Sequence, residues 1–144
     1  MTSLISEVAP ASPSEALHHF SRRFASETDC SDVYHSQKTG SVDYVLVDVR
    51  SNDAFLQAHV PGAINIPTRA ITEERMAAYA RDTLFVVYCA GPHCNGVHRA
   101  AVRLASLGFF VKEMLGGITG WVDEGLVLQR AESAVPVDGF SCEC

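Results

Sequence analysis

The segment between residues 85 and 101 holds the side chains best suited to chemistry. Cys89 directly follows the apolar run Leu84–Tyr88, and a glycine-containing loop separates it from a small-residue helix predicted at residues 100–107. Backbone amides of such a loop converge near the helix N-terminus, where the helix dipole favours negative charge. A thiolate, a persulfide or a bound oxyanion would be stabilised there, and the pKa of the thiol would fall. Cys89 is therefore the strongest candidate for a nucleophile.

The loop residues after Cys89 are candidates for a cradle around the reacting sulfur or anion. Histidine and arginine side chains of this segment add positive charge if they turn inward. The predicted cradle consists of Ala90, Gly91, Pro92, His93, Cys94, Asn95, Gly96 and Arg99. The alternative is that Cys89 is simply the last buried residue of its strand, because buried cysteines are common.

Cys94 is the second cysteine of the loop, and its role is open. Three interpretations stand side by side. Cys94 is a resolving thiol that attacks a persulfide or sulfenate on Cys89, or it is a second sulfur acceptor, or it is a small loop residue without chemistry. The spacing does not decide between these interpretations. Cys94 as the nucleophile is disfavoured, because its sulfur would lie too near the following helix.

The other cysteines lie far from this loop in the sequence. Cys30 stands alone, and Cys142 and Cys144 form a Cys-x-Cys pair at the end of the chain. That pair can bind a soft metal together with loop residues or accept sulfur, but by itself it is half a zinc site at best. A nucleophilic cysteine needs only a lowered thiol pKa and preorganised amides, so we expect no metal and no organic cofactor. This cysteine pattern also argues against a disulfide scaffold and fits a reducing compartment.

The elements that must position the loop alternate between strands and helices. Apolar runs predict strands at residues 44–49, 63–66, 84–88 and 109–111. Helical spacing and caps predict helices at residues 14–24, 52–57, 72–80, 100–107 and 118–122. Residues 28–42 are polar, and we expect turns there. The alternation predicts an α/β domain with a central, mostly parallel sheet that helices cover on both faces. The ligand site of such a domain lies beyond the carboxyl ends of the strands.

The composition agrees with one domain. The chain has 144 residues, of which 47% are hydrophobic and 19% charged. We expect a loose arm at residues 1–13, one domain at residues 14–130 and a tail at residues 131–144. The first predicted helix carries an apolar stripe from Leu17 to Phe24, which we expect to pack against the rest of the domain.

The charge and the apolar runs exclude several classes of partner. A formal net charge of -6 argues against binding of nucleic acid. No apolar run approaches the roughly 18 residues of a membrane span, and the first residues lack the basic and apolar regions of a signal peptide. We expect a soluble, cytoplasmic protein with neither nucleic acid nor membrane as a partner. The sequence does not determine the oligomeric state, and a homodimer is one of the options it leaves open.

Three separated segments resemble the rhodanese-like (sulfurtransferase) domain family. The first spans residues 46–67, the second is the loop that begins at Cys89, and the third spans residues 115–121. The resemblance implies a three-layer rhodanese fold in a single-domain form. The residues to which it assigns a mainly structural role are Asp48, Arg50, His59, Gly116, Gly117 and Trp121. His59 would be buried with a satisfied hydrogen bond rather than act as a general base.

The resemblance also implies a sulfurtransferase activity. Cys89 would take sulfane sulfur from thiosulfate or a persulfide donor and pass it to a thiol, cyanide or protein acceptor. One departure is that the loop is about two residues longer than is usual in rhodaneses, judged from the distance to the following helix. In the wider superfamily an enlarged loop accompanies phosphatases and arsenate reductases, but their arginine would stand at position 95, which is Asn95 here. A cysteine phosphatase, an arsenate reductase and a non-catalytic binding module are therefore the alternatives.

Overall fold

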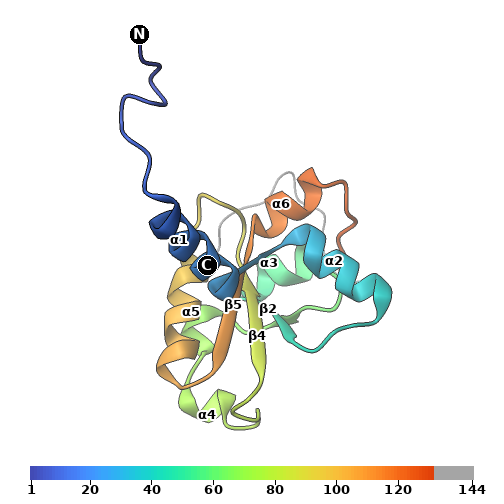
Figure 1. The fold of residues 1–144 in the computed structure, drawn as a ribbon. Helices are drawn as coiled ribbons and strands as arrows, with labels where there is room; N and C mark the ends of the chain where they lie inside the picture. The colour runs from blue at the N-terminus through green and yellow to red at the C-terminus, as the bar shows by residue number, and fades with distance from the viewer. Residues whose placement is uncertain (132–144) are drawn as a thin grey trace.

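Strands and helices alternate along the chain, as the sequence predicts (Figure 1). The structure is a computed structural model, and it describes residues 1–131. The strands are β1 (Glu27–Asp29), β2 (Val45–Asp48), β3 (Ile64–Asn65), β4 (Leu84–Tyr88) and β5 (Phe110–Leu115). The helices are α1 (Pro13–Ser26), α2 (Cys30–Thr39), α3 (Asn52–Gln57), α4 (Glu73–Met76), α5 (Gly96–Ser106) and α6 (Gly117–Asp123), with the 3-10 turn η1 (Thr68–Ala70). Cys142 and Cys144 of the predicted tail lie outside the described residues.

The strands of residues 1–131 form one five-stranded sheet in the order β1-β5-β4-β2-β3, and every pair of neighbours is parallel. This confirms the predicted parallel sheet. β4 lies at the centre, where Val45 is paired with Phe85 and Leu84 with Phe110. Because the strands run in the same direction, their carboxyl ends meet at one edge of the sheet. Cys89 follows β4 at that edge.

Helices cover both faces of the sheet. Successive side chains of a strand point to opposite faces. On one face, Phe85 and Val87 pack in a core with residues of α4 and α5. On the other face, Val86 and Tyr88 pack in a second core with α2 and with Trp121 of α6. Figure 1 shows α4 and α5 on one side of the sheet and α2 and α6 on the other. The expected three layers are present.

The prediction of turns at residues 28–42 is wrong, because β1 and α2 occupy most of this segment. Asp29 caps α2 with a side-chain oxygen that accepts a backbone N–H of the first turn, and Gly40 ends the helix in the left-handed conformation. Cys30 and Val33 are its buried residues. A helix that buries so little apolar surface has almost no hydrophobic periodicity, so only its caps predict it.

The prediction that the stripe of α1 packs against the domain is also wrong. α1 begins with the expected capping box of Ser12 and Glu15, and it contacts β1 and β5. However, Leu17, Phe20 and Phe24 are 71%, 53% and 77% exposed. Both phenylalanines line a cavity of about 270 Å³ rather than a filled core. Periodicity shows which face of a helix is apolar, but it does not show whether another element covers that face.

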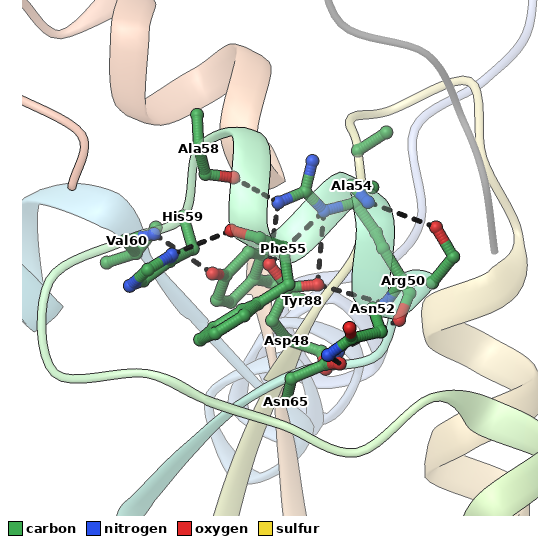
Figure 2. A network of polar contacts seen from close by, with 12 residues as sticks. Asp48, Arg50, Asn52, Ala54, Phe55, Ala58, His59, Val60, Asn65 and Tyr88 are labelled. Carbon is green, nitrogen blue, oxygen red and sulfur yellow. Dashed lines mark hydrogen bonds and ion pairs between the residues drawn. The ribbon is translucent and has the colours of Figure 1, made fainter. Parts of the chain in front are cut away.

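A buried ion pair lies at the carboxyl end of β2, one strand away from the candidate nucleophile (Figure 2). Asp48 is 0% exposed and Arg50 2%, and Nη2 of Arg50 lies 2.7 Å from Oδ2 of Asp48. The backbone N–H of Arg50 donates to Oδ1 of Asp48 at 2.9 Å, and its guanidinium donates to the carbonyl of Ala58. These bonds connect β2 to the segment after α3.

Tyr88 and Asn65 extend this network to the neighbouring strands. The hydroxyl of Tyr88 accepts the backbone N–H of Val60 at 3.0 Å. Burial, together with the negative charge of Asp48, raises the pKa of the Tyr88 hydroxyl well above its usual value. The side-chain amide of Asn65 donates to the carbonyls of Asp48 at 3.0 Å and Arg50 at 2.9 Å. Tyr88 thus joins the end of β4 to the segment after α3, and Asn65 joins β3 to the end of β2.

The turn between β5 and α6 packs against the end of β4 from the other side. Gly116 and Gly117 have φ angles of +92° and +55°. A Cβ atom at Gly117 would overlap the carbonyl oxygen of Cys89. The backbone N–H of Ile118 donates to that same carbonyl at 3.2 Å. Gly117 is thus required both by its backbone conformation and by the close contact.

Replacement of Asp48 by alanine is expected to lower the free energy of unfolding by about 3–5 kcal/mol, because Arg50 would remain as a buried charge without its carboxylate. Urea unfolding followed by the fluorescence of Trp121 measures the change. The matched control is Arg23→Ala, which removes an exposed ion pair with Glu27 and is expected to cost less than about 1 kcal/mol. Equal losses in the two variants would contradict the structural role of the buried pair.

Replacement of Gly117 by alanine is expected to cost about 3 kcal/mol or more, because the methyl group would overlap the carbonyl of Cys89 and the left-handed backbone would be strained. Gly125→Ala is the control, since Gly125 has a φ of +76° with open space around it. That variant is expected to show only the backbone cost, about 1–2 kcal/mol. The difference between the two urea midpoints reports the contact with Cys89, and equal midpoints would exclude it.

Candidate active site

The candidate nucleophile and its predicted cradle form the loop between β4 and α5. β4 ends at Tyr88 and α5 begins at Gly96, so residues 89–95 make the connection. Cys89 is 2% exposed and belongs to the core on the α5 side of the sheet. Cys94 is half-buried and packs against the same core. That this loop exceeds the usual length in the family stays a prediction.

The sulfur atoms of Cys89 and Cys94 lie 2.9 Å apart. The backbone N–H of Cys94 donates to the carbonyl of Gly91 at 3.1 Å, which folds the loop back onto its own beginning. Since the two sulfurs are in contact, Cys94 occupies space beside Cys89 that a reactant would need. The structure therefore joins the predicted nucleophile and the predicted resolving thiol in one pair.

Backbone groups at the beginning of the loop are held by α6. The N–H of Ile118 donates to the carbonyl of Cys89, and the N–H and hydroxyl of Thr119 donate to the carbonyl of Ala90 at 2.9 Å and 3.1 Å. A Cβ atom at Gly91 would lie 2.7 Å from the Thr119 hydroxyl oxygen. Sequence reasoning missed Thr119: the third motif contains it, but only the fold brings it to the loop.

The N-terminus of α5 follows the loop directly. Gly96 and Val97 are buried there, and the carbonyl of Asn95 accepts the N–H groups of His98 and Arg99. The N–H groups of a helix's first turn lack acceptors within the helix, and they carry the positive end of the helix dipole.

The predicted cradle is only partly gathered around the sulfurs. His98 points elsewhere, since its Nε2 lies 3.1 Å from Oε2 of Glu113 on β5. Of the predicted cradle, Ala90 and Gly96 are buried, Gly91 and Cys94 are half-buried, and Pro92, His93, Asn95 and Arg99 are exposed.

His59 lies away from this loop, in the segment after α3. Its Nδ1 is 2.8 Å from the carbonyl oxygen of Phe55, and the two rings are stacked with centroids 3.8 Å apart (Figure 2). Its backbone forms an antiparallel bridge with Gln129. His59 is buried. These contacts give the ring packing and hydrogen-bonding partners of its own.

Cys30 is buried on the opposite side of the sheet from Cys89. It belongs to the core with Trp121, and its thiol donates to the carbonyls of Leu115 at 3.4 Å and Gly117 at 3.6 Å. Burial and nearby carboxylates raise the pKa of the Cys30 thiol to about 11. At neutral pH this thiol is protonated, which leaves it a poor nucleophile.

Within residues 1–131, no cluster of three or more histidine, cysteine, aspartate or glutamate side chains could hold a metal ion. Nor does any helix of the described chain combine the length and the apolar character that crossing a membrane requires.

Solved structures similar to this chain share its fold. The BH2092 protein of Bacillus halodurans superposes with a TM-score of 0.79 at 37% identity, covering 83% of this chain and 87% of that one. The thiosulfate sulfurtransferase of Pseudomonas aeruginosa superposes with a TM-score of 0.62 at 21% identity, covering 78% of this chain and 21% of that one. The latter similarity concerns the fold alone.

Two curated relatives are longer than the matched region. The HTH-type transcriptional regulator Rv0324 of Mycobacterium tuberculosis is 38% identical over 90 residues, which is 58% of this chain and 39% of the regulator. Protein HIGH ARSENIC CONTENT 1, mitochondrial, of Arabidopsis thaliana is 34% identical over 107 residues, 65% of this chain and 62% of that protein. The chain thus spans less than two thirds of either. Residues 30–124 match the model of the Rhodanese-like domain, and the chain belongs to the rhodanese-like domain family.

Proposed function

We propose that the chain is a sulfurtransferase in which Cys89 carries sulfane sulfur as a persulfide. The observation that carries this proposal is the position of Cys89 between the end of central strand β4 and the N-terminus of α5. The helix dipole there favours a thiolate and an anionic persulfide over their neutral forms. Membership of the rhodanese-like family supports the assignment.

The reaction needs only the thiol and a small donor. The thiolate of Cys89 attacks the sulfane sulfur of thiosulfate, a new S–S bond forms, and sulfite leaves with the electron pair of the broken bond. An acceptor then attacks the outer sulfur of the persulfide. With cyanide the product is thiocyanate, and with a thiol or protein acceptor it is a new persulfide. The Cys89 thiolate is restored in each case, without a metal or an organic cofactor.

Access to Cys89 requires movement of Cys94. Cys89 is almost fully buried, and the neighbouring sulfur touches its own. A rotation of the Cys94 side chain, which lies on the more exposed part of the loop, opens this space. Burial then protects the persulfide from bulk water and from unrelated thiols.

Reduction of an oxyanion is the second candidate function. It is favoured by the adjacent pair of thiols, because reduction of arsenate to arsenite consumes two electrons that two thiols supply. One relative is named HIGH ARSENIC CONTENT 1. Against it, Asn95 stands where a phosphate- or arsenate-binding arginine is expected, and Arg99 is exposed. We therefore place sulfur transfer first.

Replacement of Cys89 by serine is expected to reduce sulfur transfer from thiosulfate to cyanide by roughly 1,000-fold or more, because the sulfur that forms the covalent intermediate is removed. Cys94→Ser is expected to retain transfer, since that sulfur is not part of the thiocyanate-forming steps. Cys144→Ser serves as the control for removal of a thiol outside the loop. Thiocyanate formation is the readout, and full activity of Cys89→Ser would reject the assignment.

Substrate comparison separates the candidate functions. The reduced protein is offered thiosulfate with cyanide, arsenate with a dithiol, and a phosphate ester in parallel. Turnover is expected with thiosulfate, because its sulfane sulfur can pass to the Cys89 thiolate. Neither arsenite nor phosphate is expected, because Asn95 stands where the arginine of a phosphate- or arsenate-binding loop is expected. Production of arsenite or phosphate without thiocyanate would favour the second candidate. A chain that takes up no sulfur by intact mass would instead be a binding module.

A further inference from the structure

Cys89 and Cys94 form a pair of neighbouring cysteines that the fold itself brings together. Their sulfurs are 2.9 Å apart, on the α5 side of the sheet. Cys30 is excluded from this chemistry, because it lies in the other core and donates to the carbonyls of Leu115 and Gly117. Of the cysteines that the structure describes, Cys94 is therefore the one that reaches the sulfur of Cys89.

The backbone holds this pair together. The carbonyl of Cys89 is bonded by Ile118, and the carbonyl of Ala90 by Thr119, which fixes the beginning of the loop on α6. The bond from the N–H of Cys94 to the carbonyl of Gly91 fixes the return of the loop. Attack of one sulfur on the other is thus intramolecular, and it competes with any acceptor that must diffuse to the site.

We propose that Cys94 resolves the Cys89 persulfide and releases the transferred sulfur as sulfide. The Cys94 thiolate attacks Sγ of Cys89, a Cys89–Cys94 disulfide forms, and the bond to the outer sulfur breaks. Hydrosulfide leaves with that electron pair, so the sulfane sulfur gains two electrons and the two thiols lose them. A small or protein dithiol then reduces the disulfide by exchange and restores both thiols.

The contact favours attack on the inner sulfur. After the donor has left, the Cys94 side chain rotates back to the position it has in the structure, where its sulfur lies 2.9 Å from Sγ of Cys89, so the inner sulfur is the one within reach of its thiolate. Attack on the outer sulfur would instead move the persulfide to Cys94 and release no sulfide. This proposal rests on the proposed function for the persulfide, and it adds a second outcome for the same intermediate. With a good acceptor the sulfur is transferred, and without one it leaves as sulfide.

The test uses the full chain with Cys142→Ser and Cys144→Ser, so that the tail contributes no thiol. The chain is reduced, freed of reductant, exposed to thiosulfate without any acceptor, quenched in acid and digested with trypsin. Both loop cysteines fall in the single peptide Asp82–Arg99. A persulfide adds about 32 Da to this peptide, whereas a disulfide removes about 2 Da. Released sulfide is measured in parallel, and fragment ions locate any added sulfur.

The expected result is a disulfide in the peptide and about one sulfide released per chain. Cys94→Ser in the same background is expected to keep the added sulfur on Cys89 and to release at least about tenfold less sulfide. A stable persulfide on Cys89 or on Cys94 with both thiols present would overturn this inference and leave the proposed function standing. Failure of the Cys94→Ser chain to take up sulfur would instead overturn the proposed function.

Discussion

The position of Cys89 depends on how closely the turn after β5 approaches the end of β4. The backbone of Gly117 lies against the carbonyl of Cys89, at a distance that leaves no room for a side chain. The first amides of α6 then donate to the carbonyls of Cys89 and Ala90. Because these carbonyls are held, the Cys89 side chain stays in the core on the α5 side, where Cys94 can meet it.

Alternation along the strands separates the chemistry of the cysteines. Cys89 continues the face of β4 that carries Val87, whereas Cys30 packs in the core beneath Tyr88 and Trp121. At the same carboxyl edge of the sheet, the Cys30 thiol donates to backbone carbonyls, whereas the sulfur of Cys89 contacts the sulfur of Cys94 before α5 begins. The nearby polar network supports this edge and takes no part in the contact between the sulfurs.

Much of the fold could be predicted from local patterns, but the contacts of the site could not. The strand at residues 84–88 and the helix at residues 52–57 match their predictions, because an apolar run and a capped turn are signals within one segment. The helix predicted at residues 72–80 is shorter in the structure, where it ends at the buried Met76. Its end could not be predicted, because the spacing of apolar residues does not show where burial stops. The contacts of Cys94 and Thr119 arise from loop folding and from distant segments, which no spacing encodes.

The strand order has a consequence for how the chain is made. β1 is the first strand of residues 1–131, and at the edge of the sheet it is hydrogen-bonded to β5, the last strand of that range. During synthesis on the ribosome, β1 and α1 therefore lack their contacts with β5 until β5 has been made. This edge of the sheet therefore forms only after the segment through Leu115 has been synthesised, although β1 is made before the strands of the sheet centre.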